Sequence, residues 1–215
     1  MDTIKIGYGG TLGYYDNNGY DRDSLIRKVF WTFRNINIDY KARNAVELIK
    51  SMGRIKAEEN IQINLWLWGD IDQRYNELIN RLNLKSNIRI EKSVSKDENL
   101  NRLKSCDLLL LPLERELNNQ RSLFIPGKLF DYLSIGRPIL CFGDNCEATE
   151  VLVQSGLGLV FSTPNDPDFL DFIKKVAFEK NYLKNFVPNK DYIEQYWFKN
   201  RIGLIASEFN DILDA

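Results

Sequence analysis

Short apolar runs alternate with longer segments of helical period along most of this chain, and no other feature constrains its fold as strongly. The clearest run, residues 108–111, is a row of leucines, as expected of a strand buried on both faces of a sheet. Strands joined by helices lie parallel, because each helix returns the chain to the edge where the next strand begins. The pattern therefore predicts an α/β domain with a mostly parallel sheet.

The apolar runs predict six strands, at residues 4–8, 61–68, 87–91, 107–111, 138–142 and 157–161. Apolar residues three and four apart predict helices at residues 42–55, 73–82, 96–104, 128–135, 148–154 and 168–178. We therefore expect a single doubly wound, Rossmann-like α/β domain over residues 1–215, with a mostly parallel six-stranded sheet and helices on both faces. Ligands of such domains bind at the carboxyl ends of the strands, near the point where strand order reverses.

Two segments do not follow the alternation. Residues 14–40 form an insertion after the first strand, in which basic and aromatic residues interleave. This insertion either packs its aromatic residues on its own domain or provides an amphipathic surface for a membrane or a partner. Residues 191–215 form a C-terminal helical segment, which we expect to be a helix or helix pair that packs across the domain.

Composition narrows the class of partner. With 29 basic and 30 acidic residues, the chain lacks the cationic surface that nucleic-acid binding usually needs, so we expect no nucleic-acid partner. No apolar run approaches about 18 residues, and the first residues do not resemble a signal peptide. We therefore expect a cytoplasmic protein, with peripheral contact to a membrane left open. Histidine is absent, so no imidazole serves as a base or a metal ligand.

Glycine-bearing turns follow the first two predicted strands. Gly10, Thr11, Leu12 and Gly13 come after the first strand, and Gly69 comes after the second. Glycine at the carboxyl end of a strand lets the backbone approach a phosphate or a sugar closely. The first turn is not a full G-x-G-x-x-G fingerprint, so it gives little support to a dinucleotide site and is also consistent with an ordinary turn.

A second candidate element is the predicted helix that begins near Pro126. Lys128 lies in its first turn, where a cation is unfavourable by up to about 1 kcal/mol unless an anion is bound there. Free N–H groups at a helix start favour phosphate, so Gly127 and Lys128 indicate a diphosphate site, with Asp131 one turn further along. Arg121, in the preceding loop, either helps to neutralise the phosphate or is simply exposed. 

Taken in order, these motifs resemble the C-terminal, nucleotide-sugar-binding half of retaining glycosyltransferases with the GT-B fold, of the glycosyl transferases group 1 type. The resemblance rests on residues 9–13, 65–70, 106–112, 126–138 and 155–160. It implies that the acidic residue at Asp131 binds the ribose of the donor, and that Gly127, Lys128 and Leu129 face its diphosphate. The glycine turns after the first two strands would line the same donor pocket.

The resemblance also implies the chemistry. A sugar would pass from a nucleoside-diphosphate sugar of the UDP or GDP type to an acceptor glycan or lipid-linked sugar, with retention. Neither a cofactor nor a metal is expected, because basic side chains and the helix dipole would stabilise the departing diphosphate. The acceptor-binding N-terminal half is expected to be missing, so this chain alone is expected to be inactive.

The sequence departs from the family pattern at two places. Many relatives carry two glutamates separated by seven residues, and the first would fall at Leu123, so we assign no catalytic residue. The basic residues that clamp the diphosphate after the first strand have no clear counterpart, because the insertion occupies that place. Two alternatives therefore stay open: a non-catalytic glycosyltransferase-like interaction module, and half of a sugar-nucleotide epimerase.

Overall fold

A computed structural model of the chain describes residues 3–14, 38–39, 43–116 and 121–213. Most of the expected insertion lies outside these residues. The main sheet has the order β4-β3-β1-β5-β7-β8, and every neighbouring pair in it is parallel. Its strands are β1 (Ile4–Gly9), β3 (Ile63–Trp68), β4 (Ile88–Glu91), β5 (Leu108–Pro112), β7 (Ile139–Phe142) and β8 (Gly158–Phe161). The predicted fold class is thus confirmed.

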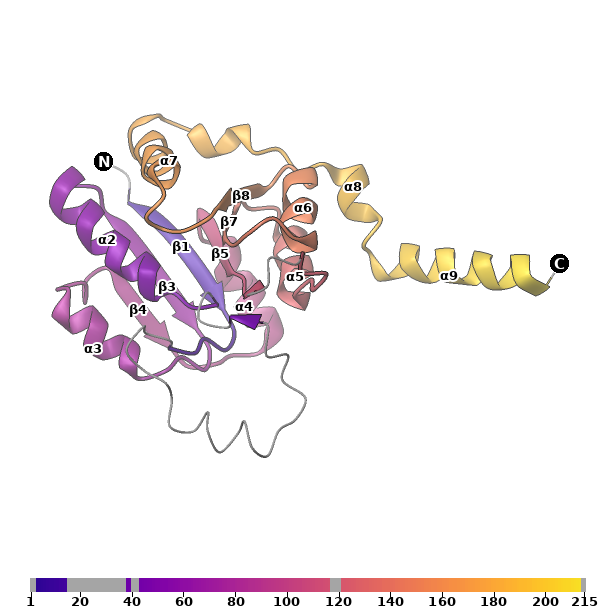
Figure 1. Ribbon diagram of the computed structural model, residues 1–215, viewed down its shortest axis with the longest axis horizontal. Coiled ribbons are helices and arrows are strands. Elements are labelled where there is room, and N and C mark those ends of the chain that lie inside the picture. The colour runs from indigo at the N-terminus through magenta and orange to yellow at the C-terminus, as the bar shows by residue number, and fades with distance from the viewer. Residues whose placement is uncertain (1–2, 15–37, 40–42, 117–120, 214–215) are drawn as a thin grey trace.

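Six helices follow the strands as the sequence predicts (Figure 1). They are α2 (Val46–Glu59), α3 (Arg74–Arg81), α4 (Lys96–Lys104), α5 (Gly127–Ile135), α6 (Glu147–Gln154) and α7 (Pro167–Phe178). The expected start of α2 at residue 42 is wrong. Asn44 Oδ1 accepts a hydrogen bond from the Val46 N–H at 2.7 Å, so a local turn precedes the helix.

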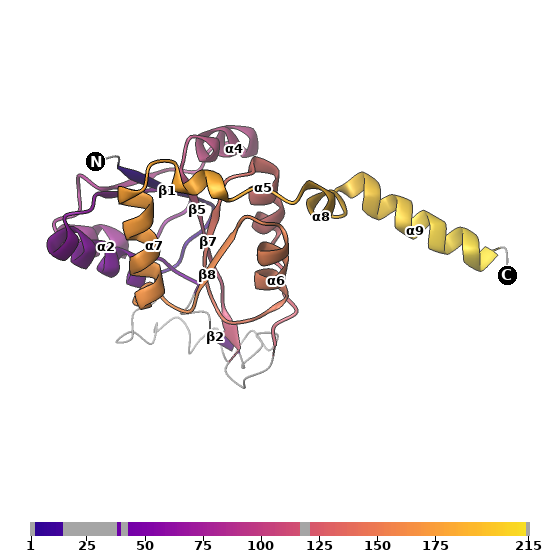
Figure 2. The ribbon, with the colours of Figure 1, turned by 90° about the horizontal axis from the view of Figure 1, so that it is seen from above.

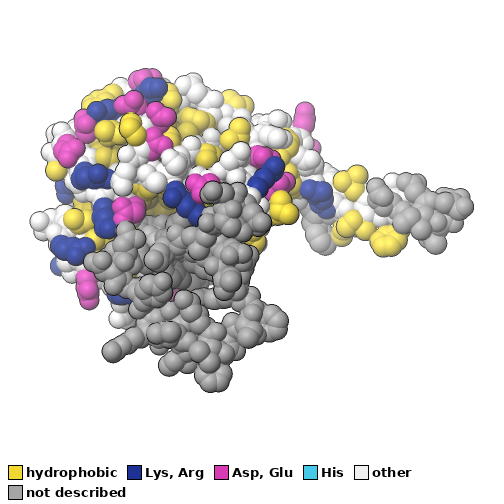
Figure 3. Space-filling view, viewed as in Figure 1, with side chains coloured by type: hydrophobic (Ala, Val, Ile, Leu, Met, Phe, Trp, Pro, Cys, Tyr) yellow, Lys and Arg dark blue, Asp and Glu magenta, His cyan; other side chains and the backbone are white. Residues whose placement is uncertain are grey.

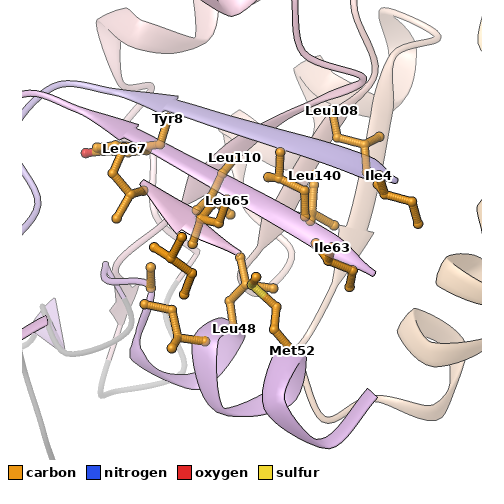
Figure 4. Packing of buried hydrophobic residues seen from close by; sticks show 14 of the residues in the cluster. Ile4, Tyr8, Leu48, Met52, Ile63, Leu65, Leu67, Leu108, Leu110 and Leu140 are labelled. Atoms are coloured by element: carbon orange, nitrogen blue, oxygen red, sulfur yellow. The ribbon is translucent and has the colours of Figure 1, made fainter. Parts of the chain in front are cut away.

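Leucines of β5 point alternately to the two faces of the sheet, and each face has its own apolar core. Leu108 and Leu110 pack in the core covered by α2, α3 and α7 (Figure 4). Leu109 and Leu111 pack in the second core, under α4, α5 and α6. All four are buried, which confirms that β5 is a central strand. Figure 2 shows the two helical layers on either side of the sheet.

Strand order reverses between β1 and β5, because the chain moves outward through β3 and β4 and then returns to the other side of β1. A doubly wound sheet opens a crevice at this point, at the carboxyl ends of the strands. Shortly after β5, the chain forms the short strand β6 (Arg115–Glu116), which pairs antiparallel with β2 (Ile38–Asp39). The chain that returns from the insertion is therefore tied to the segment that follows β5.

The C-terminal helices correct one expectation. A 3-10 turn (Tyr182–Asn185) and α8 (Lys190–Glu194) lead into α9 (Phe198–Leu213), which extends away from the domain instead of packing across it (Figures 1 and 2). Four apolar side chains of α9 are 47–63% exposed: Ile202, Leu204, Ile205 and Phe209. Figure 3 shows hydrophobic (yellow) side chains on the described part of this projection. Both faces of the sheet already carry helices α2 to α7. None of the described helices is long and apolar enough to cross a bilayer.

Candidate functional site

Two glycine turns lie side by side at the carboxyl ends of β1 and β3. The Gly10 N–H donates to the Trp68 carbonyl at 2.8 Å, and the Leu12 N–H donates to the Asp70 carbonyl at 2.9 Å. Gly69 has φ +145°, and a Cβ atom there would lie 2.1 Å from the Gly10 carbonyl oxygen. Only glycine permits this approach, because a side chain would displace the neighbouring backbone.

The remaining residues of the first turn have different surroundings. Thr11 is exposed, and its carbonyl accepts a hydrogen bond from the Tyr8 hydroxyl at 2.6 Å. The Gly13 carbonyl accepts one from the Tyr75 hydroxyl at 2.9 Å. The Leu12 side chain is buried in the core, so only its backbone is available to a ligand. Gly10 and Thr11 can therefore face a donor, as predicted, whereas the Leu12 side chain cannot.

Helix α5 begins at this edge without an acid and without a side-chain cap among the described residues. Pro126 precedes it in an extended conformation, and the Leu129 N–H donates to the Pro126 carbonyl at 2.9 Å. The N–H groups of Gly127 and Lys128 find no acceptor in the part of the chain that the structure describes. Leu129 is fully buried, so its side chain anchors the helix in the core and cannot contact a phosphate.

The structure brings Lys128 onto the first glycine turn. Its Nζ lies 3.7 Å from the centroid of the Tyr8 ring, and a Cβ atom built on Gly10 would be 2.9 Å from Nζ. Among the described residues, no carboxylate pairs with this amine. The pKa of Lys128 is lowered to about 7, mainly by burial and further by the positive charge of Arg43, with Asp131 partly opposing the shift.

Arg43 is a candidate site residue that the sequence argument missed. It lies between the insertion and α2, and its Nη1 is 3.5 Å from Oε2 of Glu114, whose side chain is only 8% exposed. Its positive charge lowers the pKa of both Lys128 and Tyr8. Arg43 is therefore a candidate for the basic clamp that had no clear counterpart in the sequence. The available clue was its position directly before a helix that begins at the carboxyl edge of the sheet.

Two buried tyrosines hold the end of β1 in place. The Gly9 N–H donates to the Tyr132 hydroxyl oxygen at 3.3 Å, which ties the strand to α5. Desolvation raises the pKa of Tyr8 to about 12 and raises that of Tyr132 as well, so both hydroxyls stay protonated at neutral pH. Neutral hydrogen bonds thus position the end of β1. The positive charges considered for this site are those of Lys128 and Arg43.

Asp131 is partly exposed one turn after Lys128, and its Oδ1 lies 2.8 Å from Nζ of Lys96 on α4. The hydrogen bond to Asp131 raises the pKa of Lys96. Ion pairs this open to solvent contribute little to stability, so Asp131 can exchange Lys96 for another partner at little cost. The position of Asp131 is consistent with the ribose contact that the family pattern implies.

Arg121 is not brought to the start of α5. Its Nη2 lies 2.7 Å from Oε2 of Glu147 and 2.5 Å from Oε2 of Glu150, both on α6. Two carboxylates thus already neutralise this guanidinium, and the expected phosphate contact is not supported by its position. Leu123, at the place of the family's first glutamate, is 77% exposed. Within the described residues, no group of three or more Cys, Asp or Glu side chains is arranged to hold a metal ion.

Comparison with known families agrees with this arrangement. The model of the family "Glycosyl transferases group 1" matches residues 35–191, and the chain belongs to this family. The family to which the sequence motifs pointed is thus confirmed. A search of curated proteins gives no significant match.

Several solved structures share the fold. Sucrose-phosphate synthase from Thermosynechococcus elongatus is 14% identical with a TM-score of 0.60, over 98% of this chain and 45% of that one. HepE from Anabaena, in complex with UDP, is 13% identical with a TM-score of 0.58; the match covers 97% of this chain and 49% of HepE. The pneumococcal O-GlcNAc transferase GtfA, in complex with UDP and GlcNAc, is 11% identical with a TM-score of 0.55; the match covers 99% of this chain and 36% of GtfA. The chain thus spans half or less of these proteins.

Proposed function

We propose that this chain is the donor-binding half of a glycosyltransferase, and that the site at Lys128 and Gly10 holds the diphosphate of a nucleoside-diphosphate sugar. The observation that carries the proposal is the Lys128 amine. It is partly buried over the Tyr8 ring, its pKa is lowered by burial and by the charge of Arg43, and it has no carboxylate partner among the described residues. A buried ammonium without a counter-charge is costly, and a bound anion removes that cost.

The surroundings of this amine suit a diphosphate. The Gly127 and Lys128 N–H groups lie at the positive end of α5, and Arg43 adds a second charge. As the bond to the sugar breaks, negative charge grows on the departing diphosphate, and fixed cations and N–H groups stabilise it there. Asp131 would exchange Lys96 for the hydroxyls of the ribose. Departure of this kind, with retained configuration at the sugar, is the reaction we propose for the complete enzyme.

UDP is the nucleotide to test first, and GDP the second. Two of the solved structures with this fold were determined with UDP bound. Base and sugar are recognised by loop backbone and by shape, so the cations of this site do not select between the two nucleotides. The donor itself is a substrate, and the proposed chemistry requires neither a metal nor an organic cofactor.

Acceptor binding is proposed to belong to a second, N-terminal α/β half outside residues 1–215. The exposed apolar side chains of α9 support this, since a helix face of this kind is normally covered. The proposed acceptor is a glycan or a lipid-linked sugar, reached from the cytoplasm with peripheral contact to a membrane. Without the second half, this chain is expected to bind the nucleotide and not to transfer the sugar.

Titration calorimetry with UDP and GDP tests the donor site. Lys128→Ala removes a charge-assisted contact and is expected to weaken binding about ten- to hundredfold. Asp131→Ala is expected to weaken it about tenfold. Arg121→Ala is the matched control, because it removes a cation that α6 already neutralises, and it should change the affinity less than about twofold.

The outcomes separate the alternatives. A folded protein that binds neither nucleotide would contradict the proposal and favour an interaction module. Equal losses for Lys128→Ala and Arg121→Ala would place the diphosphate away from α5. The double variant Ile202→Ser, Ile205→Ser should leave UDP affinity unchanged, because both residues lie on α9. The same variant should bind less of an apolar dye, because both side chains are exposed.

A further inference from the structure

Apolar residues recur along α9 at alternating intervals of four and three residues. They are Phe198, Ile202, Ile205, Phe209 and Ile212, and we call this set the seam. The spacing is the one by which two helices pack along each other. The structure describes the side chains of Ile202, Ile205 and Phe209, which are 47%, 55% and 63% exposed. The described part of the seam therefore lacks a cover within this domain.

The charges of α9 are divided between its two halves. Both cations, Lys199 and Arg201, lie in the first half of its sequence, and both acids, Glu208 and Asp211, lie in the second. A second copy of the helix that lay parallel would bring like charges together. In an antiparallel pair, the basic half of each helix faces the acidic half of the other, and the helix dipoles run in opposite directions. The charge of α9 thus complements a second copy only in the antiparallel orientation.

An apolar groove lies at the base of α9. Its volume is about 180 Å³, and it is lined by Phe130, Leu133, Ser134, Ile193, Tyr196 and Trp197. In the antiparallel pair that sets Ile202 opposite Ile205 of the second copy, the same register sets residue 198 opposite Phe209 of that copy. The C-terminal end of the second helix therefore reaches the residues before α9, which line the groove.

We infer that two copies of this chain form a reversible dimer, in which the α9 helices pack antiparallel along the seam and the end of each helix covers the groove of the other copy. The seam spans little more than two heptads, fewer than the three or four or so that a coiled coil normally needs, so the groove supplies further apolar area. The contact is the same on both copies and closes after two. Helix α9 lies beyond residues 35–191, so the inference does not rest on the family match.

The dimer goes beyond the proposed nucleotide site and does not depend on it. Leu204, which is 57% exposed, comes two residues after Ile202 and therefore lies about 200° around the helix, on the side away from the seam. That side stays open to the N-terminal half proposed above, so the two contacts are compatible.

Sedimentation equilibrium of the full chain tests the dimer. The mean mass should rise from one chain toward two between about 1 and 200 µM protein. Ile205→Glu places a charge in the seam and should weaken the dimer at least about tenfold. It should leave UDP affinity in calorimetry unchanged, so the failure of either proposal is visible without the other. A chain that stays monomeric over the whole range would overturn the inference and leave the seam to the N-terminal half.

Leu204→Glu is the matched control. Leu204 and Ile205 are neighbours in the chain and are 57% and 55% exposed, but they lie on different sides of the helix. Leu204→Glu should change the dimer affinity less than about twofold. Equal effects of the two variants would show general apolar association and would also overturn the inference.

Reversal of charge tests the orientation. Lys199→Glu with Arg201→Glu makes every charge of α9 negative and should weaken the dimer at least about tenfold. Adding Glu208→Lys with Asp211→Lys gives the two halves opposite charges again and should restore the dimer. Loss without restoration, or no loss in the first variant, would contradict the antiparallel pair.

Disulfide cross-linking checks the same register, because the three native cysteines are buried. Phe209→Cys should not link to itself, since the two 209 positions lie about 16 Å apart along the antiparallel pair, beyond the reach of a disulfide. Mixing this variant with Phe198→Cys should give a linked dimer. Linking of Phe209→Cys to itself would show a parallel pair and overturn the proposed one.

The groove is tested through Ser134, the exposed residue of its lining. Ser134→Lys places a charge at the groove without changing the apolar core, and it should weaken the dimer about threefold or more. An unchanged affinity would overturn the proposed cover of the groove.

Discussion

Helices α5 and α6 both begin at the carboxyl edge of the sheet, yet their first turns have opposite electrostatics. Helix α6 carries Glu147 and Glu150, which Arg121 neutralises, and the Cys146 N–H donates to the Thr149 hydroxyl at 2.9 Å. Helix α5 has Lys128 and no acid in its first turn. The start of α6 therefore has acidic and side-chain partners, whereas the start of α5 has neither among the described residues, which suits the anion that we propose for it.

The largest effect is expected from Gly69→Ala, which breaks the turn against which Lys128 is held. The new Cβ would lie 2.1 Å from the Gly10 carbonyl oxygen at φ +145°, so we expect a loss of about 2–3 kcal/mol in unfolding free energy. Urea denaturation measures it. Gly127→Ala is the control: its Cβ meets no atom within 4 Å, and we expect no loss of stability. Equal effects at the two glycines would contradict this view of the edge.

The second test uses pH to sharpen the contrast between the two helix starts. Lys128 has a pKa of about 7 in the free protein, and a bound diphosphate favours its charged form. UDP affinity should therefore fall as pH rises from 7.5 to 9, about tenfold in total, a range in which the phosphate itself is fully ionised.

Calorimetry of two variants provides the controls for this pH series. Lys128→Arg should bind with little pH dependence, because the guanidinium stays charged throughout. Arg121→Ala should keep the wild-type profile. A flat wild-type profile would show that Lys128 does not gain a proton on binding.

A third test concerns stability. The pKa of Lys128 in the folded state lies below the ordinary lysine value of 10.5, so the unfolded chain binds more protons between pH 7 and 10.5. Lys128 thus destabilises the folded state fully below pH 7, and less as pH rises through that window. Lys128→Met should raise the melting temperature by a few degrees at pH 6 and by less at pH 9. A larger gain at pH 9 would contradict this sign.

The smallest effect is expected at α6. Arg121→Ala removes two exposed ion pairs and should lower the unfolding free energy by less than about 1 kcal/mol, with the loss shrinking in high salt. Thermal denaturation at two ionic strengths checks this. A loss that salt does not change would mean that Arg121 acts through packing instead.

The comparison also shows how far the sequence argument reached. It placed the six strands and six helices because burial on both faces of the sheet leaves long-range patterns in local sequence. It also found Gly69 and Lys128, since glycine at a strand end and lysine at a helix start are unusual locally. It did not separate Lys128 from Arg121, because the acids that neutralise Arg121 lie 26 and 29 residues further along the chain.

Arg43 and α9 were misjudged for the same kind of reason. Arg43 reaches the site because α2 starts at the carboxyl edge and Glu114 holds its side chain nearby. The apolar spacing in α9 correctly predicts a helix, but it does not predict against which surface the apolar face of that helix packs. Both depend on contacts between segments that are far apart in the chain.

By itself, the sequence determined the alternation of strands and helices, the positions of the glycine turns and the family, because each is encoded in short stretches of residue type. Only the tertiary structure decided which cation has no counter-charge among the residues that it describes. That depends on which acids, distant in sequence, fold against it, since charge compensation and burial are properties of neighbours in space.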